Sequence, residues 1–155
     1  MHHHKLFAVL GCAVLTLGLA PARSAVTEHI VINEIHYNPD VKTERVEFIE
    51  LYNAGTNVVN LGGWYFSDGP SNVFPATVVQ PGGYVVVAQD PTALAAKFTG
   101  VTALGPFNAD RSSVLSKYGE QITLRNSAGQ VIDEVDYQIG FPWPTVGDPP
   151  GYSIE

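Results

Sequence analysis

The chain has 155 residues, 45% of them hydrophobic, and 15 acidic residues against 8 Lys and Arg give a formal charge of -7. A chain of this length buries one hydrophobic core, so a single domain is expected. The acidic balance disfavours nucleic acids and other polyanions as partners. The one cysteine, Cys12, cannot form a disulfide within the chain, which excludes the small disulfide-stapled scaffolds.

The first 24 residues have the layout of a secretory signal peptide. Lys5 supplies the positive start, residues 6–20 form a nearly continuous apolar run, and Ala22-Arg23-Ser24 offers small residues for cleavage. The run is shorter than the roughly 20 residues that cross a membrane as a helix. We therefore expect a mature chain without a transmembrane segment, secreted or held at the cell envelope, whose domain spans residues 26–155.

Cleavage changes the charge of the mature chain. It removes Lys5 and Arg23 and leaves 6 basic against 15 acidic residues, a net charge of about -9. Lipid attachment at Cys12 is a lesser alternative to cleavage after Ser24. The apolar run continues for eight residues beyond Cys12, whereas a lipoprotein leader would normally end there.

Short β-rich runs separated by turn residues dominate from Glu28 onward, without a sustained helical apolar period. The pattern predicts an all-β sandwich of two packed sheets. The expected strands hold residues 31–37, 45–53, 58–61, 64–66, 73–79, 84–88, 121–126 and 130–138.

Several of these runs carry more detailed predictions. Val31, Ile35 and Tyr37 are expected on one face of the first strand, and Trp64 in the core. Pro75 limits its strand to an edge or a bulge, because proline cannot donate to a ladder.

Two further segments have distinct signals. The apolar run 84–88 is expected to be covered on both faces, as in a strand deep between sheets. Residues 91–98 have the one helix signal, with Asp90 as cap and Pro91 in the first position. Ser127-Ala128-Gly129 predicts a tight hairpin between the last two strands.

Six blocks of sequence, in this order, resemble the lamin tail domain in its bacterial form. The blocks are INEI (32–35), EFIELYN (47–53), LGGW (61–64), PGGYVVVA (81–88), LS with GEQITL (115–116, 119–124) and GQVIDEVDY (129–137). The resemblance covers roughly residues 26–155. It implies an immunoglobulin-like sandwich with no inherited catalytic residues.

The resemblance also implies the kind of function to expect. It indicates a non-catalytic interaction, adhesion or spacer module of the cell envelope, with a protein or another envelope component as partner. We expect the module to be monomeric, and the acidic charge of the chain argues against nucleic acid as a partner. Tyr152-Ser153-Ile154 looks like the start of a strand, so the domain is expected to be cut short at its C-terminal end and to belong to a larger exported protein.

The acidic residues of the strands leave one enzymatic alternative open, a small secreted carbohydrate-active or metal-dependent hydrolase. The carboxylates in question are Glu34, Glu47, Glu50, Asp133, Glu134 and Asp136. A glycosidase needs two carboxyls about 5–9 Å apart across a cleft, and the sequence shows no such meeting. No cofactor is expected; calcium remains open, because it binds clustered carboxylate and carbonyl oxygens.

Glu34, Glu50 and Trp143 are the candidate recognition residues. Trp143 lies between two prolines, whose rigid backbone could present the ring at low entropic cost, or the ring could plug the end of the sandwich. His36 is expected to be a solvated strand residue rather than a metal ligand.

Overall fold

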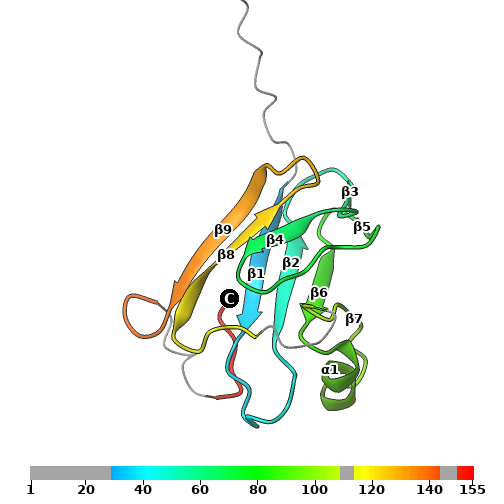
Figure 1. Ribbon diagram of the computed structural model, residues 1–155. Coiled ribbons are helices and arrows are strands. Elements are labelled where there is room, and N and C mark those ends of the chain that lie inside the picture. The colour runs from blue at the N-terminus through cyan, green and yellow to red at the C-terminus, as the bar shows by residue number, and fades with distance from the viewer. Residues whose placement is uncertain (1–28, 109–113, 144–149) are drawn as a thin grey trace, which may run out of the picture.

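The computed structural model describes residues 29–108, 114–143 and 150–155. The leader, including Cys12, lies outside them. In the part of the chain that is described, the fold is a two-layer β-sandwich with one short helix (Figure 1), which confirms the all-β prediction. No helix among these residues is long and apolar enough to span a bilayer.

Two sheets make the layers of the sandwich. The first, called here the β2 sheet, has the order β1-β2-β6-β7; the second, the β8 sheet, has the order β4-β8-β9; and β3 pairs with β5 alone. The strands of the β2 sheet are β1 (Ile30–His36), β2 (Phe48–Asn53), β6 (Tyr84–Ala88) and β7 (Ala103–Leu104). The other strands are β3 (Val59–Asn60), β4 (Tyr65–Asp68), β5 (Val78–Val79), β8 (Gly119–Arg125) and β9 (Val131–Gln138).

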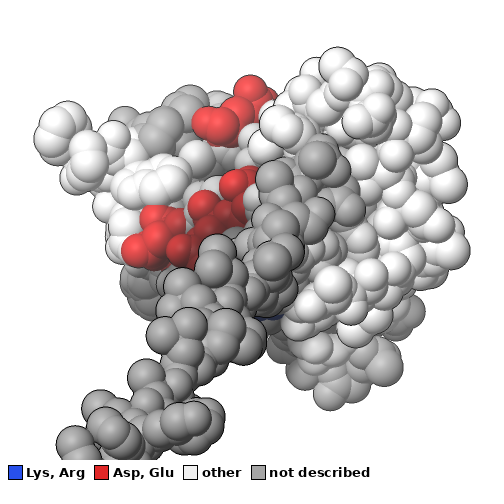
Figure 2. All heavy atoms as spheres, turned by 90° about the horizontal axis from the view of Figure 1, so that it is seen from above, with Lys and Arg blue, Asp and Glu red and all other residues white. Residues whose placement is uncertain are grey.

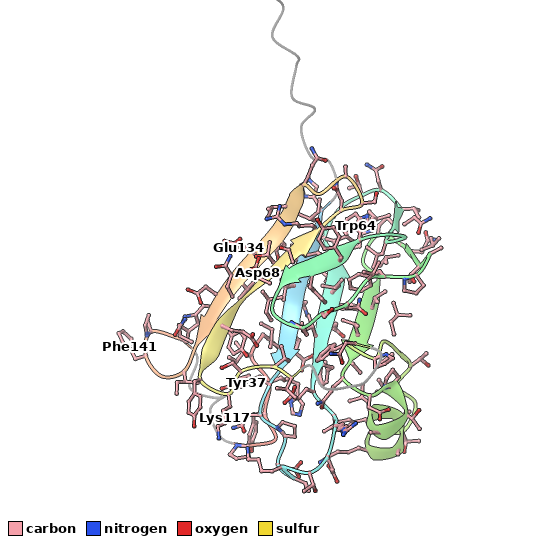
Figure 3. The ribbon with its side chains drawn as sticks, in the orientation of Figure 1. Tyr37, Trp64, Asp68, Lys117, Glu134 and Phe141 are labelled. Carbon is pink, nitrogen blue, oxygen red and sulfur yellow. The ribbon has the colours of Figure 1, made fainter. Side chains whose placement is uncertain are left out.

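The two-residue alternation of the sequence decides which side chains fill the core. In β2, Ile49 and Leu51 are buried while Phe48, Glu50 and Tyr52 face outward, as predicted. Trp64 is 3% exposed, which confirms its core position, and it lies at the upper end of the sandwich in Figure 3. The core also holds Ile30, Ile35, Tyr37, Val59, Leu61, Phe66, Phe74, Val79, Val87, Phe107, Leu115, Ile122, Leu124, Tyr137 and Ile154.

Helix α1 (Pro91–Lys97) confirms the helix signal. The Asp90 carboxylate accepts hydrogen bonds from the backbone N–H groups of Thr92 and Ala93, at 3.1 and 3.3 Å, and so satisfies two donors that the first turn leaves unpaired. Leu94 is buried in a small second core with Val46 and Ala88. The helix therefore packs beside β6 and β7, at the lower end of the β2 sheet in Figure 1.

The structure corrects two strand predictions. The bounds of β6 are right, but Tyr84 is 57% exposed and Val85 and Val86 are half-buried, so the strand is not covered on both faces. Among the described residues, no layer covers the outer face of the β2 sheet at that end. Between residues 73 and 79 the regular strand is reduced to β5, with Val73 forming an isolated bridge to Tyr65, because Pro75 cannot take part in the ladder.

The last described residues lie beside β1. Ile35 and Ile154 exchange two backbone hydrogen bonds, of 2.9 and 3.0 Å between N and O, and Gly151 N–H donates to Asn38 O at 2.7 Å. Ile154 is buried at 4% exposure. Residues 150–155 thus add a short edge segment to the β2 sheet and bring Gly151 and Ser153 to its outer face.

Candidate functional site

A β-bulge in β1 shapes the outer face of the β2 sheet. Ile32 is opposite Leu51 and Glu34 is opposite Glu50, so Asn33 is the extra residue of β1. The bulge shifts the alternation by one residue: Ile30 and Ile32 pack toward the core before it and Ile35 after it, and Glu34 turns outward. The prediction that Val31 shares the core face with Ile35 is wrong for this reason.

A groove of about 310 Å³ follows on that outer face, between β1, β2, β6 and α1. We call it the outer groove. All ten lining residues are described: Glu34, His36, Phe48, Glu50, Val86, Leu94, Phe98, Val101, Gly151 and Ser153. Five of them give an apolar wall, and two are carboxylates, so the groove combines apolar surface with negative charge.

The two carboxylates of the outer groove are held by neighbouring polar groups. Asn33 Nδ2 donates to Glu50 Oε1 at 3.0 Å, and the Ser153 hydroxyl donates to Glu34 Oε1. Burial raises the pKa of Glu50; the Asn33 hydrogen bond opposes this, and the charge of Glu34 adds to it. The structure therefore brings two of the three candidate recognition residues side by side.

His36, the last residue of β1, lines the outer groove and is not solvated as expected. It is 4% exposed, its ring stacks on Phe48 at 5.2 Å between centroids, and it meets Phe98 edge-on at 6.5 Å. Burial lowers the pKa of His36, against the effect of a hydrogen bond with the Tyr152 backbone. His36 does point away from the core of the sandwich, as predicted, but Phe48 and Phe98 cover this part of the outer face and bury the ring.

Trp143, the third candidate, lies elsewhere. It is half-buried and packs against the main core, while Phe141 two residues earlier is 95% exposed and projects from the loop after β9 (Figure 3). The outer groove does not include either ring. The proline-flanked segment thus exposes Phe141 to solvent. The packing of Trp143 against the core fits the alternative in which its ring plugs the end of the sandwich.

Glu47 forms a second polar cluster, at the start of β2 on the inner side. Its Oε2 accepts a hydrogen bond from Leu115 N–H at 2.7 Å, and the residue is 9% exposed. Burial raises the pKa of Glu47 to about 7, the charge of Glu120 adding to the effect while the Leu115 hydrogen bond and Lys42 oppose it. A cavity of about 490 Å³ adjoins this carboxyl.

Tyr137 completes the Glu47 cluster from β9. Its hydroxyl lies 2.5 Å from Ser116 O and 3.1 Å from Glu120 Oε1, and Ser116 N–H donates to the same Glu120 oxygen at 2.6 Å. Burial raises the pKa of Tyr137, so the phenol keeps its proton. These contacts fix residues 115 and 116 against the sheets, which gives the cluster a structural role.

The remaining strand carboxylates lie apart from the outer groove. Asp133 Oδ2 accepts from Ile32 N–H at 2.7 Å and so links β9 to β1. The Glu134 carboxylate of β9 accepts a hydrogen bond from the Thr123 hydroxyl of β8 at 3.1 Å. On the other side of β8, the register partner of Thr123 is Asp68 of β4 (Figure 3). In Figure 2 acidic side chains gather on the left, the side of β9 in Figure 1, with almost no Lys or Arg in view.

Metal binding finds no ready set of ligands in the described part of the chain. No group of three or more His, Cys, Asp or Glu side chains within it could hold a metal ion. In the outer groove Glu34 and Glu50 stand together, but with His36 they do not form such a group. Calcium binding therefore stays a prediction without a defined site.

The sequence matches one known family. The model of the Lamin Tail Domain matches residues 23–138, about three quarters of the chain, and its last matched residue is the end of β9. No curated protein matches the chain. The match includes every residue of the outer groove except Gly151 and Ser153.

Proposed function

Because the chain belongs to the lamin tail domain family, whose members are immunoglobulin-like interaction domains, we propose that it is an exported binding module of the bacterial cell envelope. In this proposal it is non-catalytic, forms part of a larger protein, and recognises a protein or another envelope component through the outer groove. The outer groove is the observation that carries the proposal.

Several features of the outer face support its use for binding. The side chains on the inner faces of both sheets are buried in the core, so a partner must be recognised by an outer face or by loops. Two residues beyond Glu50 along β2, Tyr52 pairs with Tyr84 of β6; their ring centroids are 4.7 Å apart, and Tyr84 is 57% exposed. Exposed tyrosine beside apolar surface is typical of interfaces.

The arrangement of polar groups in the outer groove favours binding over hydrolysis. Glu34 and Glu50 are register partners on adjacent strands and so stand on the same wall, whereas glycosidase carboxyls flank the scissile bond from two sides. The His36 ring is enclosed by Phe48 and Phe98. A small carbohydrate-active or metal-dependent hydrolase is the alternative, and the Glu34–Glu50 pair is the observation in its favour.

Export is supported by the sequence of residues 1–24, with its positive start, apolar run and small-residue exit. The test is to express the whole chain in a bacterial host, separate the compartments, and determine the N-terminus of the product. We expect a chain that begins near Ala25 outside the cytoplasm. A cytoplasmic product with an intact leader would refute export.

Binding is tested with the processed protein and isolated cell envelopes in a sedimentation assay. We expect saturable binding that falls in the double variant Glu34→Gln/Glu50→Gln and persists in Glu134→Gln/Asp136→Asn, a matched loss of two charges on the other sheet. Release of sugars from a polysaccharide panel, abolished by Glu50→Gln alone, would instead establish the hydrolase.

A further inference from the structure

We propose that the outer groove binds one basic side chain, arginine or lysine, of a protein partner, so that the ligand of this module is a cationic peptide segment. The inference rests on the proposed function, in that it takes the outer groove as the binding face. It goes further by naming the chemistry of the ligand.

The shape of the outer groove suits a long side chain with a polar end. Lysine and arginine lay their methylene stems along apolar surface and keep the charged head in a polar setting. Val86, Phe98 and Val101 offer such surface on one side, and Glu34 and Glu50 stand at the β1–β2 side. The methylene chain of the ligand side chain would therefore lie on the apolar surface, and its charged end would reach the two carboxylates.

The two carboxylates of the outer groove favour a cationic ligand. Glu34 and Glu50 are directly opposite on adjacent strands, an arrangement of like charges that destabilises a sheet. None of the ten lining residues is Lys or Arg. Lys97, on the neighbouring helix, is already paired with Asp40 and Glu44. An incoming basic group would offset the repulsion between the two carboxylates.

The hydrogen bonds around the carboxylates leave room for such a group. Asn33 and Ser153 each donate to the Oε1 atom of one carboxylate and fix its position. Within the described chain no hydrogen bond reaches the Oε2 atom of either. Two preset acceptors thus remain, and a guanidinium carries five N–H donors with which to reach them.

The buried histidine does not compete with this cation. His36 lines the outer groove, and burial lowers its pKa, which favours the neutral ring. A neutral His36 adds no positive charge to the groove. Phosphates, carboxylates and acidic lipid surfaces are therefore disfavoured as ligands of this face.

The experiment is a nuclear magnetic resonance titration of the processed, isotope-labelled protein with the blocked tripeptide Gly-Arg-Gly. Gly-citrulline-Gly, which has nearly the same shape without the charge, is the control ligand. We expect saturable shifts of amide signals in β1, β2 and α1 with the arginine peptide and none with the citrulline peptide. Spectra of each variant before titration show whether it is folded.

Variants then locate the site. Glu50→Gln is expected to weaken binding about three- to tenfold, since hydrogen bonds to charged groups are strong but this site is half exposed. Glu34→Gln/Glu50→Gln should abolish binding. Glu134→Gln, an equal change of charge on the β8 sheet, should leave the affinity unchanged.

Three results would overturn the inference. These are shifts that spread over all acidic surfaces without saturation, equal binding of the citrulline peptide, and equal weakening by Glu134→Gln and Glu50→Gln. If the arginine peptide fails while envelope binding still depends on Glu34 and Glu50, the ligand class is wrong and the proposed function stands. If envelope binding fails and the peptide titration succeeds, the inference holds and the envelope role falls.

Discussion

Replacement of Glu47 by glutamine is expected to remove a pH-dependent loss of stability. In the folded chain the pKa of Glu47 is about 7, against 4.5 for an ordinary glutamate, because the carboxyl is buried. Between these values the folded chain holds the proton and the unfolded chain has released it. The unfolded state therefore binds fewer protons, and the free energy of unfolding falls as the pH rises through this window.

The size of the effect follows from the two pKa values. The difference between 4.5 and about 7 corresponds to about 3 kcal/mol of stability, lost as the pH rises from about 4.5 to about 7. Glutamine does not titrate, and its side-chain oxygen can still accept from Leu115 N–H. Near pH 4.5 the variant should match the parent, and at pH 8 it should be more stable by about 3 kcal/mol.

The assay is urea unfolding of both proteins at several values between pH 4.5 and pH 8, with the difference in free energy plotted against pH. The comparison with the variant matters because other groups titrate in the same range. The lowered pKa of His36 makes stability rise with pH, and the raised pKa of Glu50 makes it fall. Both are present in the parent and in the variant and so cancel. A difference that stays constant from pH 4.5 to pH 8 would refute the reasoning.

Four further predictions concern the core, the Glu47 cluster, the helix cap and the surface. Trp64→Ala should lower the free energy of unfolding, measured with urea, by about 3–5 kcal/mol, as expected when a large core aromatic is removed. A decrease under about 1 kcal/mol would contradict the packing of Trp64 in the core. Tyr137→Phe should lower the free energy of unfolding by about 1–2 kcal/mol, because it removes the hydrogen bonds to Ser116 and Glu120. An unchanged free energy of unfolding would show that these hydrogen bonds do not stabilise the fold. Asp90→Ala should cost about 1 kcal/mol and Asp90→Ser much less, which separates capping from charge. Duplex DNA should not be retained in a filter assay at physiological salt, because the acidic surface repels phosphates; micromolar binding would contradict this.

Local signals in the sequence were sufficient where one physical effect decides the structure. Helix α1 follows from Asp90 and Pro91, and the hairpin follows from residues 127–129, where Gly129 N–H donates to Asn126 O at 2.9 Å. The strand β2 follows from plain alternation. In each case the residues that determine the element are its near neighbours in the chain.

The outer groove could be predicted only in part. The sequence indicates Glu34 and Glu50 as candidates, but their pairing depends on the bulge at Asn33. The signal for the bulge is the spacing of three between Ile32 and Ile35, which breaks the period of two. The apolar wall is contributed by β2, β6, α1 and the residues that follow α1. Contacts across such a separation in sequence leave no local pattern.

The Glu47 cluster was not predicted at all. Glu47 looks like any strand carboxylate in the sequence, and its burial depends on Leu115, 68 residues away. The sequence of the proline-flanked segment likewise does not show which of its two rings is exposed. In the structure Phe141 is exposed and Trp143 is half-buried. Burial of a polar or aromatic side chain by distant segments is a property of the assembled sandwich.

The segment of residues 150–155 beside β1 bears on self-association. An unpaired strand edge is a template on which a second chain can add and from which aggregates can grow. Along β1, Asp133 occupies the N–H of Ile32, the bulge at Asn33 interrupts the ladder, and Ile154 occupies the N–H and carbonyl of Ile35. A strand from a second copy would find these groups already engaged, so this edge of the sandwich resists growth into an intermolecular sheet.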